Sequence, residues 1–194
     1  MASQSFAQLV SLACHDLRTP LATASGFART LQRLDSVGQP AERYVEMIGA
    51  ATDQLGSLLD LLSAAARVED ERFEPQLRTF DSRALAQAAA DRLDGGRVAI
   101  EGDGVDVQAD ANWGALSLSA LAEAARRHGG LEQITLSVDG PEVSIAPLVE
   151  AAGAIAAGED LRDFGAAVGA RVLSATGAAI SLDDDALRIR FPTE

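Results

Sequence analysis

The sequence has little positive charge, few aromatic residues and almost no cysteine. Its formal net charge of -13 and its pI near 4.5 argue against binding to nucleic acid or to an anionic membrane surface, because both require clustered lysine or arginine. The single cysteine, Cys14, excludes an intrachain disulfide and a metal site built from thiolates at zinc-finger spacing. We therefore expect a protein of a reducing compartment that binds neither nucleic acid nor a structural metal ion.

The sequence also lacks a run of about 18 apolar residues, the length that a membrane-spanning helix needs. The N-terminal residues MASQSFAQ contain neither the basic segment nor the apolar stretch of a secretory signal. We expect a soluble, cytoplasmic protein with no membrane partner. If the chain is complete, we expect it to receive its signal through another protein or not at all.

Alanine and leucine, by contrast, are abundant, and aromatic residues make up only 4% of the chain. This balance favours helices that pack through small and aliphatic side chains. The 194 residues are 47% hydrophobic, enough for a core. The length permits either one large domain or two small ones.

Two helical stripes occupy the first third of the chain. Apolar residues recur at steps of three and four between residues 6 and 34, and again between residues 45 and 66, which predicts two long helices. Gly38 and Pro40 interrupt the pattern and predict a turn. A two-helix hairpin cannot bury both stripes within itself, so we predict a homodimer in which two copies form a four-helix bundle.

The sequence changes character near residue 70. A charged stretch containing Pro75 reads as a linker, so we predict a helical hairpin over residues 1–69 and a second domain over residues 70–194. The second domain alternates expected helices with expected strands, and one alanine- and glycine-rich stretch reads as a loop or weak helix. The expected helices are 82–93, 112–128 and about 161–175, and the expected strands are 97–102, 105–110, 134–140, 142–146, 178–183 and 186–192. This order predicts an α+β fold with helices on one face of a mixed sheet.

His15 stands out on the first expected helix. It lies between Ala13 and Leu17 of the apolar stripe, and at about 100° per residue it points away from that stripe, toward solvent. Thr19 follows one turn later on the same face, and Asp16 is adjacent. Imidazole suits reversible phosphoryl transfer, because it is nucleophilic at neutral pH and leaves readily once phosphorylated. Taken alone, however, a single histidine on a helix is most often an ordinary surface residue.

The residues around His15 favour the more specific interpretation. The string HDLRTPL at residues 15–21, preceded by Phe6 and followed by Gly26 and Leu31, resembles the phosphoacceptor helix of two-component histidine kinases. In that family the histidine is phosphorylated, and the proline bends the helix just beyond it. A proline inside a helix costs roughly 3 kcal/mol, and the resemblance supplies a reason for tolerating Pro20.

The resemblance implies a role for each residue of a predicted site. His15 would be the phosphoacceptor, and Asp16 would orient its ring and accept its proton. Arg18 would hold phosphoryl oxygens or the acidic pocket of a receiver domain, and Thr19 would support phosphatase activity. Receivers would dock near His15 and Leu21, and near residues 55–62 on the second helix.

Residues 73–194 resemble the catalytic, ATP-binding domain of the same kinases, but only in pattern. The family's magnesium-binding asparagine corresponds to Glu123, or to Ala124 if the register slips by one. Its adenine-binding aspartate and the following glycines correspond to the residues APLV at 146–149. Of the phosphate-binding glycine turn only Gly165 matches, and the preceding glycine position holds Asp163, whose charge would repel a triphosphate. Residues 148–160 are also short for a nucleotide lid.

These departures imply a degenerate ATP-binding domain, so we predict no cofactor, with neither ATP nor magnesium bound. A different alignment would leave Asp110, Asp139 or Asp183 as the nucleotide-binding aspartate. The predicted function is that of a pseudo-histidine kinase, or a histidine phosphotransfer protein similar in plan to the dimeric histidine phosphotransferases. It would relay a phosphoryl group between His15 and receiver-domain aspartates. The alternatives are an active but divergent ATP-dependent sensor kinase, and a non-catalytic dimeric regulator of a partner histidine kinase.

Overall fold

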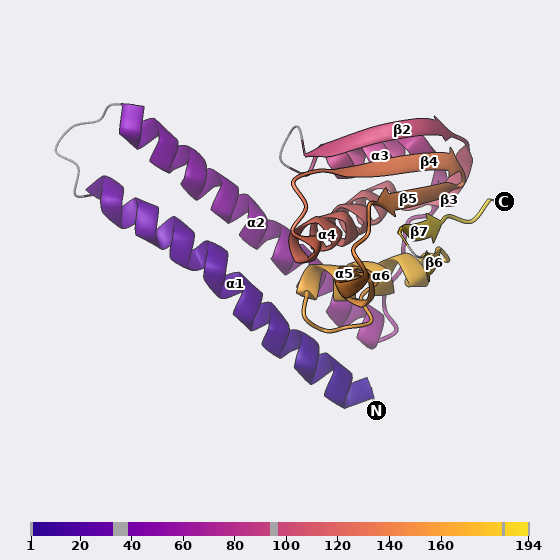
Figure 1. The fold of residues 1–194 in the computed structure, drawn as a ribbon. Helices are drawn as coiled ribbons and strands as arrows, with labels where there is room; N and C mark the ends of the chain where they lie inside the picture. The colour runs from indigo at the N-terminus through magenta and orange to yellow at the C-terminus, as the bar shows by residue number, and fades with distance from the viewer. Residues whose placement is uncertain (1, 33–38, 94–96, 184, 194) are drawn as a thin grey trace. The chain divides into compact units, whose positions relative to one another are not determined.

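The structure, a computed structural model, describes residues 2–32, 39–93, 97–183 and 185–193. It divides into two compact units, Met1–Ser63 and Ala64–Glu194 (Figure 1). The division falls inside the second long helix, which ends at Glu69, so this helix continues into the second unit. Within the described residues, no helix has the length and apolar character required to cross a membrane.

Two helices of 31 residues each follow the two apolar stripes, as predicted, and the first unit contains the first helix and most of the second. Helix α1 is Ala2–Gln32 and helix α2 is Gln39–Glu69, and the turn predicted at Gly38 lies outside the described residues. Pro20 stands inside α1 without ending it. The ring of Phe27 on α1 stacks on that of Tyr44 on α2, with centroids 5.5 Å apart. This contact joins the C-terminal half of α1 to the N-terminal end of α2, as an antiparallel hairpin requires.

A single hairpin leaves part of both apolar stripes uncovered. Leu9 and Ala13 on α1 are fully buried, and Ala51 and Leu61 on α2 are nearly so. Other large apolar side chains of the same helices are exposed to solvent: Leu21 by 55%, Val45 by 59% and Leu59 by 54%. The stripe predicted on α2 is therefore split, since Leu55 is half-buried while Val45 and Leu59 are open.

The second unit contains the mixed sheet that the sequence predicted (Figure 1). Its strands run in the order β2-β4-β5-β7-β6, with β2 and β4 parallel and the other neighbours antiparallel. A separate antiparallel pair joins β1 to β3. The strands are β1 Arg78–Asp81, β2 Val98–Gly104, β3 Asp106–Ala109, β4 Ile134–Gly140, β5 Glu142–Ala146, β6 Ala179–Leu182 and β7 Leu187–Arg190.

The helices of this unit cover one face of the sheet (Figure 1). They are α3 Ser82–Ala90, α4 Ala111–Gly129, α5 Glu150–Ala156 and α6 Phe164–Ala175. Along β4 the apolar residues Ile134, Leu136 and Val138 are buried, and the polar residues between them are partly exposed, which is the alternation of a strand with one covered face. The α+β architecture is therefore confirmed, and the stretch read as a loop or weak helix contains α5.

Helix α4 lies at the centre of the helical layer, packed against α3, α5 and α6. Its contact with α6 depends on a small residue: a Cβ at Gly169 would lie 2.8 Å from Leu121 and 3.2 Å from the carbonyl oxygen of Ser117. The two helix backbones can approach closely only because Gly169 has no side chain. This packing fixes the C-terminal end of α4 beside the start of α6.

The linker after α2 is fastened to the start of α4. The ring of Phe73 packs edge-on against Trp113, with centroids 5.8 Å apart. The amide of Gln76 donates to Oδ2 of Asp110 (2.8 Å), while Oδ1 of Asp110 accepts from the amides of Asn112 and Trp113 in the first turn of α4. One carboxylate therefore caps α4 and holds the linker.

Candidate functional site

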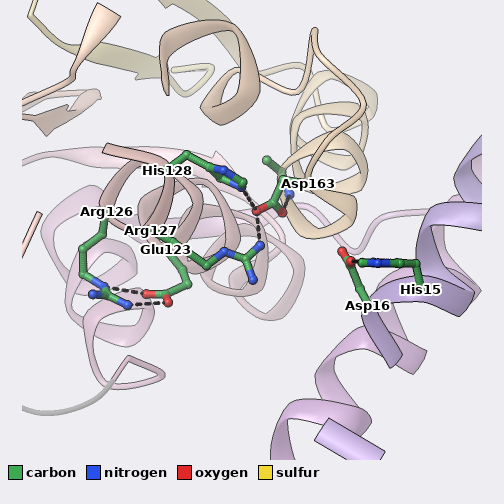
Figure 2. Close-up of polar contacts among 8 residues, drawn as sticks. His15, Asp16, Glu123, Arg126, Arg127, His128 and Asp163 are labelled. Atoms are coloured by element: carbon green, nitrogen blue, oxygen red, sulfur yellow. Dashed lines mark hydrogen bonds and ion pairs between the residues drawn. The ribbon is translucent and has the colours of Figure 1, made fainter. Parts of the chain in front are cut away.

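His15 lies on the exposed surface of α1, as its position relative to the apolar stripe predicted. Its side chain is 76% exposed, and its Nδ1 atom lies 3.1 Å from Oδ1 of Asp16 (Figure 2). An ionised carboxylate can only accept a hydrogen bond, so the contact selects the tautomer in which Nδ1 carries the proton. Nε2 then keeps its lone pair, on a ring that is largely exposed.

This arrangement provides a nucleophile on an open helix face. The Nε2 lone pair can attack an electrophilic phosphorus atom, and Asp16 can stabilise the positive charge that develops on the ring through the Nδ1–H contact. Arg18 and Thr19 are exposed three and four positions later, on the same face of α1. The structure thus places all four predicted residues together. The roles of His15, Asp16, Arg18 and Thr19 stay predictions.

In the second unit, Glu123 stands at the position that corresponds to the family's magnesium-binding asparagine, and it forms an ion pair. Glu123 on α4 accepts two hydrogen bonds from Arg126, from Nε (2.9 Å) and Nη2 (2.7 Å) (Figure 2). Ala124, the alternative in the shifted register, is fully buried and has no ligating atom. Among the described residues, no group of three or more histidine, cysteine or acidic side chains could hold a metal ion.

The position expected to recognise adenine also carries no polar side chain. The peptide between Ala146 and Pro147 is cis, and Leu148 is buried against the core. The amide of Leu148 donates to the carbonyl oxygen of Asp185 (2.7 Å), and the chain then enters α5. Two of the three alternative aspartates are engaged elsewhere, since Asp110 caps α4 and Asp183 pairs with Arg188.

Asp163 differs most from what the sequence suggested. Helix α6 begins at Phe164 rather than near Leu161, because Asp163 is its N-cap: Oδ1 accepts from the amide of Ala166 (3.0 Å). Oδ2 accepts from Arg127 and lies 3.0 Å from Nε2 of His128 (Figure 2). The charge of this carboxylate was expected to repel a triphosphate. Instead it is buried and neutralised by groups of α4.

Sequence reasoning missed this cluster of Arg127, His128 and Asp163. Arg127 and Asp163 are 36 positions apart, and only the packing of α4 against α6 brings them together. One local signal was present, because an aspartate directly before an apolar helical stretch is a typical N-cap. That signal fixes where α6 begins, but it does not identify the cationic partners.

Comparison with known proteins shows that the two N-terminal helices match a known domain family. Residues 7–71 match the model of the His Kinase A (phospho-acceptor) domain. Over 136 residues the chain is 32% identical to histidine protein kinase DivJ of Caulobacter vibrioides. That match covers 69% of this chain but 21% of the relative, so the chain spans about a fifth of the length of the curated relative.

Solved structures share the whole architecture. Histidine kinase AdeS of Acinetobacter baumannii aligns with a TM-score of 0.61 and 20% identity, over 92% of this chain and 97% of that one. A bacterial phosphotransferase aligns with a TM-score of 0.52 and 13% identity, over 94% and 93%. Identities this low establish the fold alone: two N-terminal helices followed by an α/β sheet domain of the kind found in histidine kinases.

Proposed function

We propose that this chain, which is similar to the histidine kinases of two-component systems and matches their phospho-acceptor domain at residues 7–71, is a dimeric histidine phosphotransfer protein. It relays a phosphoryl group between His15 and the aspartates of receiver domains, and it does not use ATP. The observation that carries the proposal is the exposed His15 ring with its Nδ1 atom on Asp16, in a chain whose second unit offers no nucleotide-binding side chains at the expected positions.

The transfer follows from the geometry of α1. Nε2 of His15 attacks the phosphorus of a receiver's aspartyl phosphate, an N–P bond forms, and the acyl P–O bond breaks to release the receiver carboxylate. Asp16 holds the proton on Nδ1 during this step. Arg18 pairs with the phosphoryl oxygens, and Thr19 supports the water that dephosphorylates a receiver. The reverse reaction passes the group to a second receiver aspartate, so neither step consumes a nucleotide.

Three features of the second unit support the absence of ATP use. Glu123 is occupied by Arg126, the stretch after β5 is apolar, and Asp163 is paired with Arg127 and His128. Each lost polar or metal contact costs about 1 to 3 kcal/mol, and each factor of ten in affinity corresponds to about 1.4 kcal/mol. Three such losses would raise the dissociation constant of a micromolar nucleotide site above physiological nucleotide concentrations.

Homodimerisation would cover part of the apolar side chains left open on α1 and α2, Leu59 among them, while receivers would dock where the dimer leaves these helices exposed. We expect a Leu59→Asp variant to dissociate, because an interface leucine replaced by an unpaired charge costs several kcal/mol. The expected dimer dissociation constant rises at least about 100-fold, measured by sedimentation equilibrium. The matched control is Leu182→Asp, the same change at an exposed leucine of β6, which leaves the dimer intact. A monomeric wild-type chain at micromolar concentration would remove the basis of the proposal for a dimer.

Asp16 is expected to act through the His15 ring. In an Asp16→Asn variant the neutral amide holds Nδ1–H more weakly and no longer offsets the ring's positive charge, so the rate of phosphoryl transfer from a receiver should fall about 10-fold, or about 1.4 kcal/mol. The check is a single-turnover time course at saturating receiver. Asp53→Asn removes the same charge from an exposed position on α2 and should leave the rate unchanged. Equal rates in both variants would exclude the proposed role of Asp16.

The proposed function is tested by incubating the chain with a phosphorylated receiver in the absence of nucleotide. Label on His15 that then passes to a second, unlabelled receiver supports the relay. Co-purification with a histidine kinase, without label on His15, would favour the non-catalytic regulator instead. Magnesium-dependent nucleotide binding in a calorimetric titration would favour the divergent sensor kinase.

A further inference from the structure

The contacts of Asp163 have the form of a small anion-binding site. Its carboxylate is 5% exposed and is held by three donors: the amide of Ala166 in the first turn of α6, the guanidinium of Arg127 and Nε2 of His128 (Figure 2). Amides at a helix N-terminus, together with cationic side chains, are the groups that bind phosphate and sulfate in proteins. Here the anion that they bind belongs to the chain itself.

Burial makes this internal contact difficult to displace. The donors remain partly open, since the side chain of Arg127 is 49% exposed and that of His128 is 26% exposed. A dissolved oxyanion could therefore reach them, but it would compete with a carboxylate tethered to the backbone, whose effective concentration is on the order of millimolar or higher. It would also leave Asp163 as a buried charge without partners, at a cost of several kcal/mol.

We propose that the Asp163 carboxylate is a built-in ligand that fills an oxyanion cradle formed by Arg127, His128 and the Ala166 amide, and so keeps phosphate groups out of it. The inference deepens the proposed function and rests on its statement that the second unit does not use ATP. The donors of the cradle are then still present, and the Asp163 carboxylate occupies it. Removal of the single carboxylate should expose it.

The test uses the full chain with Asp163→Gly. Glycine is tolerated at an N-cap, and this substitution empties the space of the carboxylate without removing a donor. In calorimetric titrations with sodium phosphate, we expect the variant to bind phosphate with a dissociation constant about 10-fold or more below that of the wild type. The matched control is Asp160→Gly, which creates the same residue and removes the same charge from an exposed ion pair with Arg162. It should bind no better than the wild type.

Two further measurements make the result specific. In the Asp163→Gly variant, phosphate should shift the NMR signal of the Ala166 amide, and adding Arg127→Gln should abolish the gain in affinity. An Asp163→Gly protein with the far-UV circular dichroism of the wild type but no gain in phosphate binding would overturn the inference. So would equal gains in the two glycine variants. Magnesium–ATP binding to the wild type would instead contradict the proposed function, so the two failures are distinguishable.

Discussion

Replacement of His15 by glutamine is expected to abolish label transfer from a phosphorylated receiver domain to this chain, a loss of at least about 1000-fold. Glutamine keeps a polar side chain on the exposed face of α1 but has no nucleophilic ring nitrogen. The helix should be unaffected, because His15 is 76% exposed and its one described contact is with the neighbouring Asp16. The measurement is acid-labile label on the chain after incubation with the phosphorylated receiver.

The chain provides an internal control, because it contains only two histidines. A His128→Gln variant loses the other imidazole, which contacts Asp163 in the second unit. It should accept label at the wild-type rate. Transfer to His15→Gln at the wild-type rate would refute the assignment of the acceptor, and loss of transfer in His128→Gln alone would move the acceptor to the second unit.

Truncation of Phe164 to alanine is expected to destabilise the second unit by about 3 to 5 kcal/mol, the usual cost of deleting a large buried aromatic ring. Phe164 is fully buried, the largest such side chain among the described residues, and it begins α6 directly after the N-cap Asp163. The loss combines the transfer of its apolar surface with the cavity that remains. Urea denaturation followed by the fluorescence of Trp113, the single tryptophan, reports on this unit.

The matched control for Phe164 is Val105→Ala, because Val105 is apolar but 42% exposed. Its effect should stay within about 0.5 kcal/mol. A Phe164→Ala protein as stable as the Val105→Ala protein would show that α6 does not contribute to the cooperative core of this unit.

Most helices and strands could be predicted from the sequence, because the spacing of their apolar residues indicates each element locally. The steps of three and four in α1 and α2 predicted both long helices, and the alternation of buried and exposed residues in β4 is visible in ITLSV. Helix α5 was ambiguous, since its residues EAAGAIA combine good helix formers with a glycine. The predicted domain boundary after residue 69 coincides with the end of α2, while the compact units divide earlier in that helix.

The candidate site was predictable to the extent that it is local. His15, Asp16 and Thr19 lie within five residues, so helical geometry alone places them on one surface. The Asp163 contacts were not predictable, because they depend on how α4 and α6 pack, and that packing depends in turn on the close approach at Gly169. A residue with an unfavourable charge in a sequence comparison can therefore be a paired, buried residue in the fold.

The most direct test of the account compares two phosphoryl donors with the same wild-type chain. One reaction contains magnesium and ATP labelled on the γ-phosphate, and the other contains a labelled phospho-receiver without nucleotide. We predict label on His15 only from the receiver, followed by its passage to a second receiver. Label on His15 from ATP alone would contradict the account.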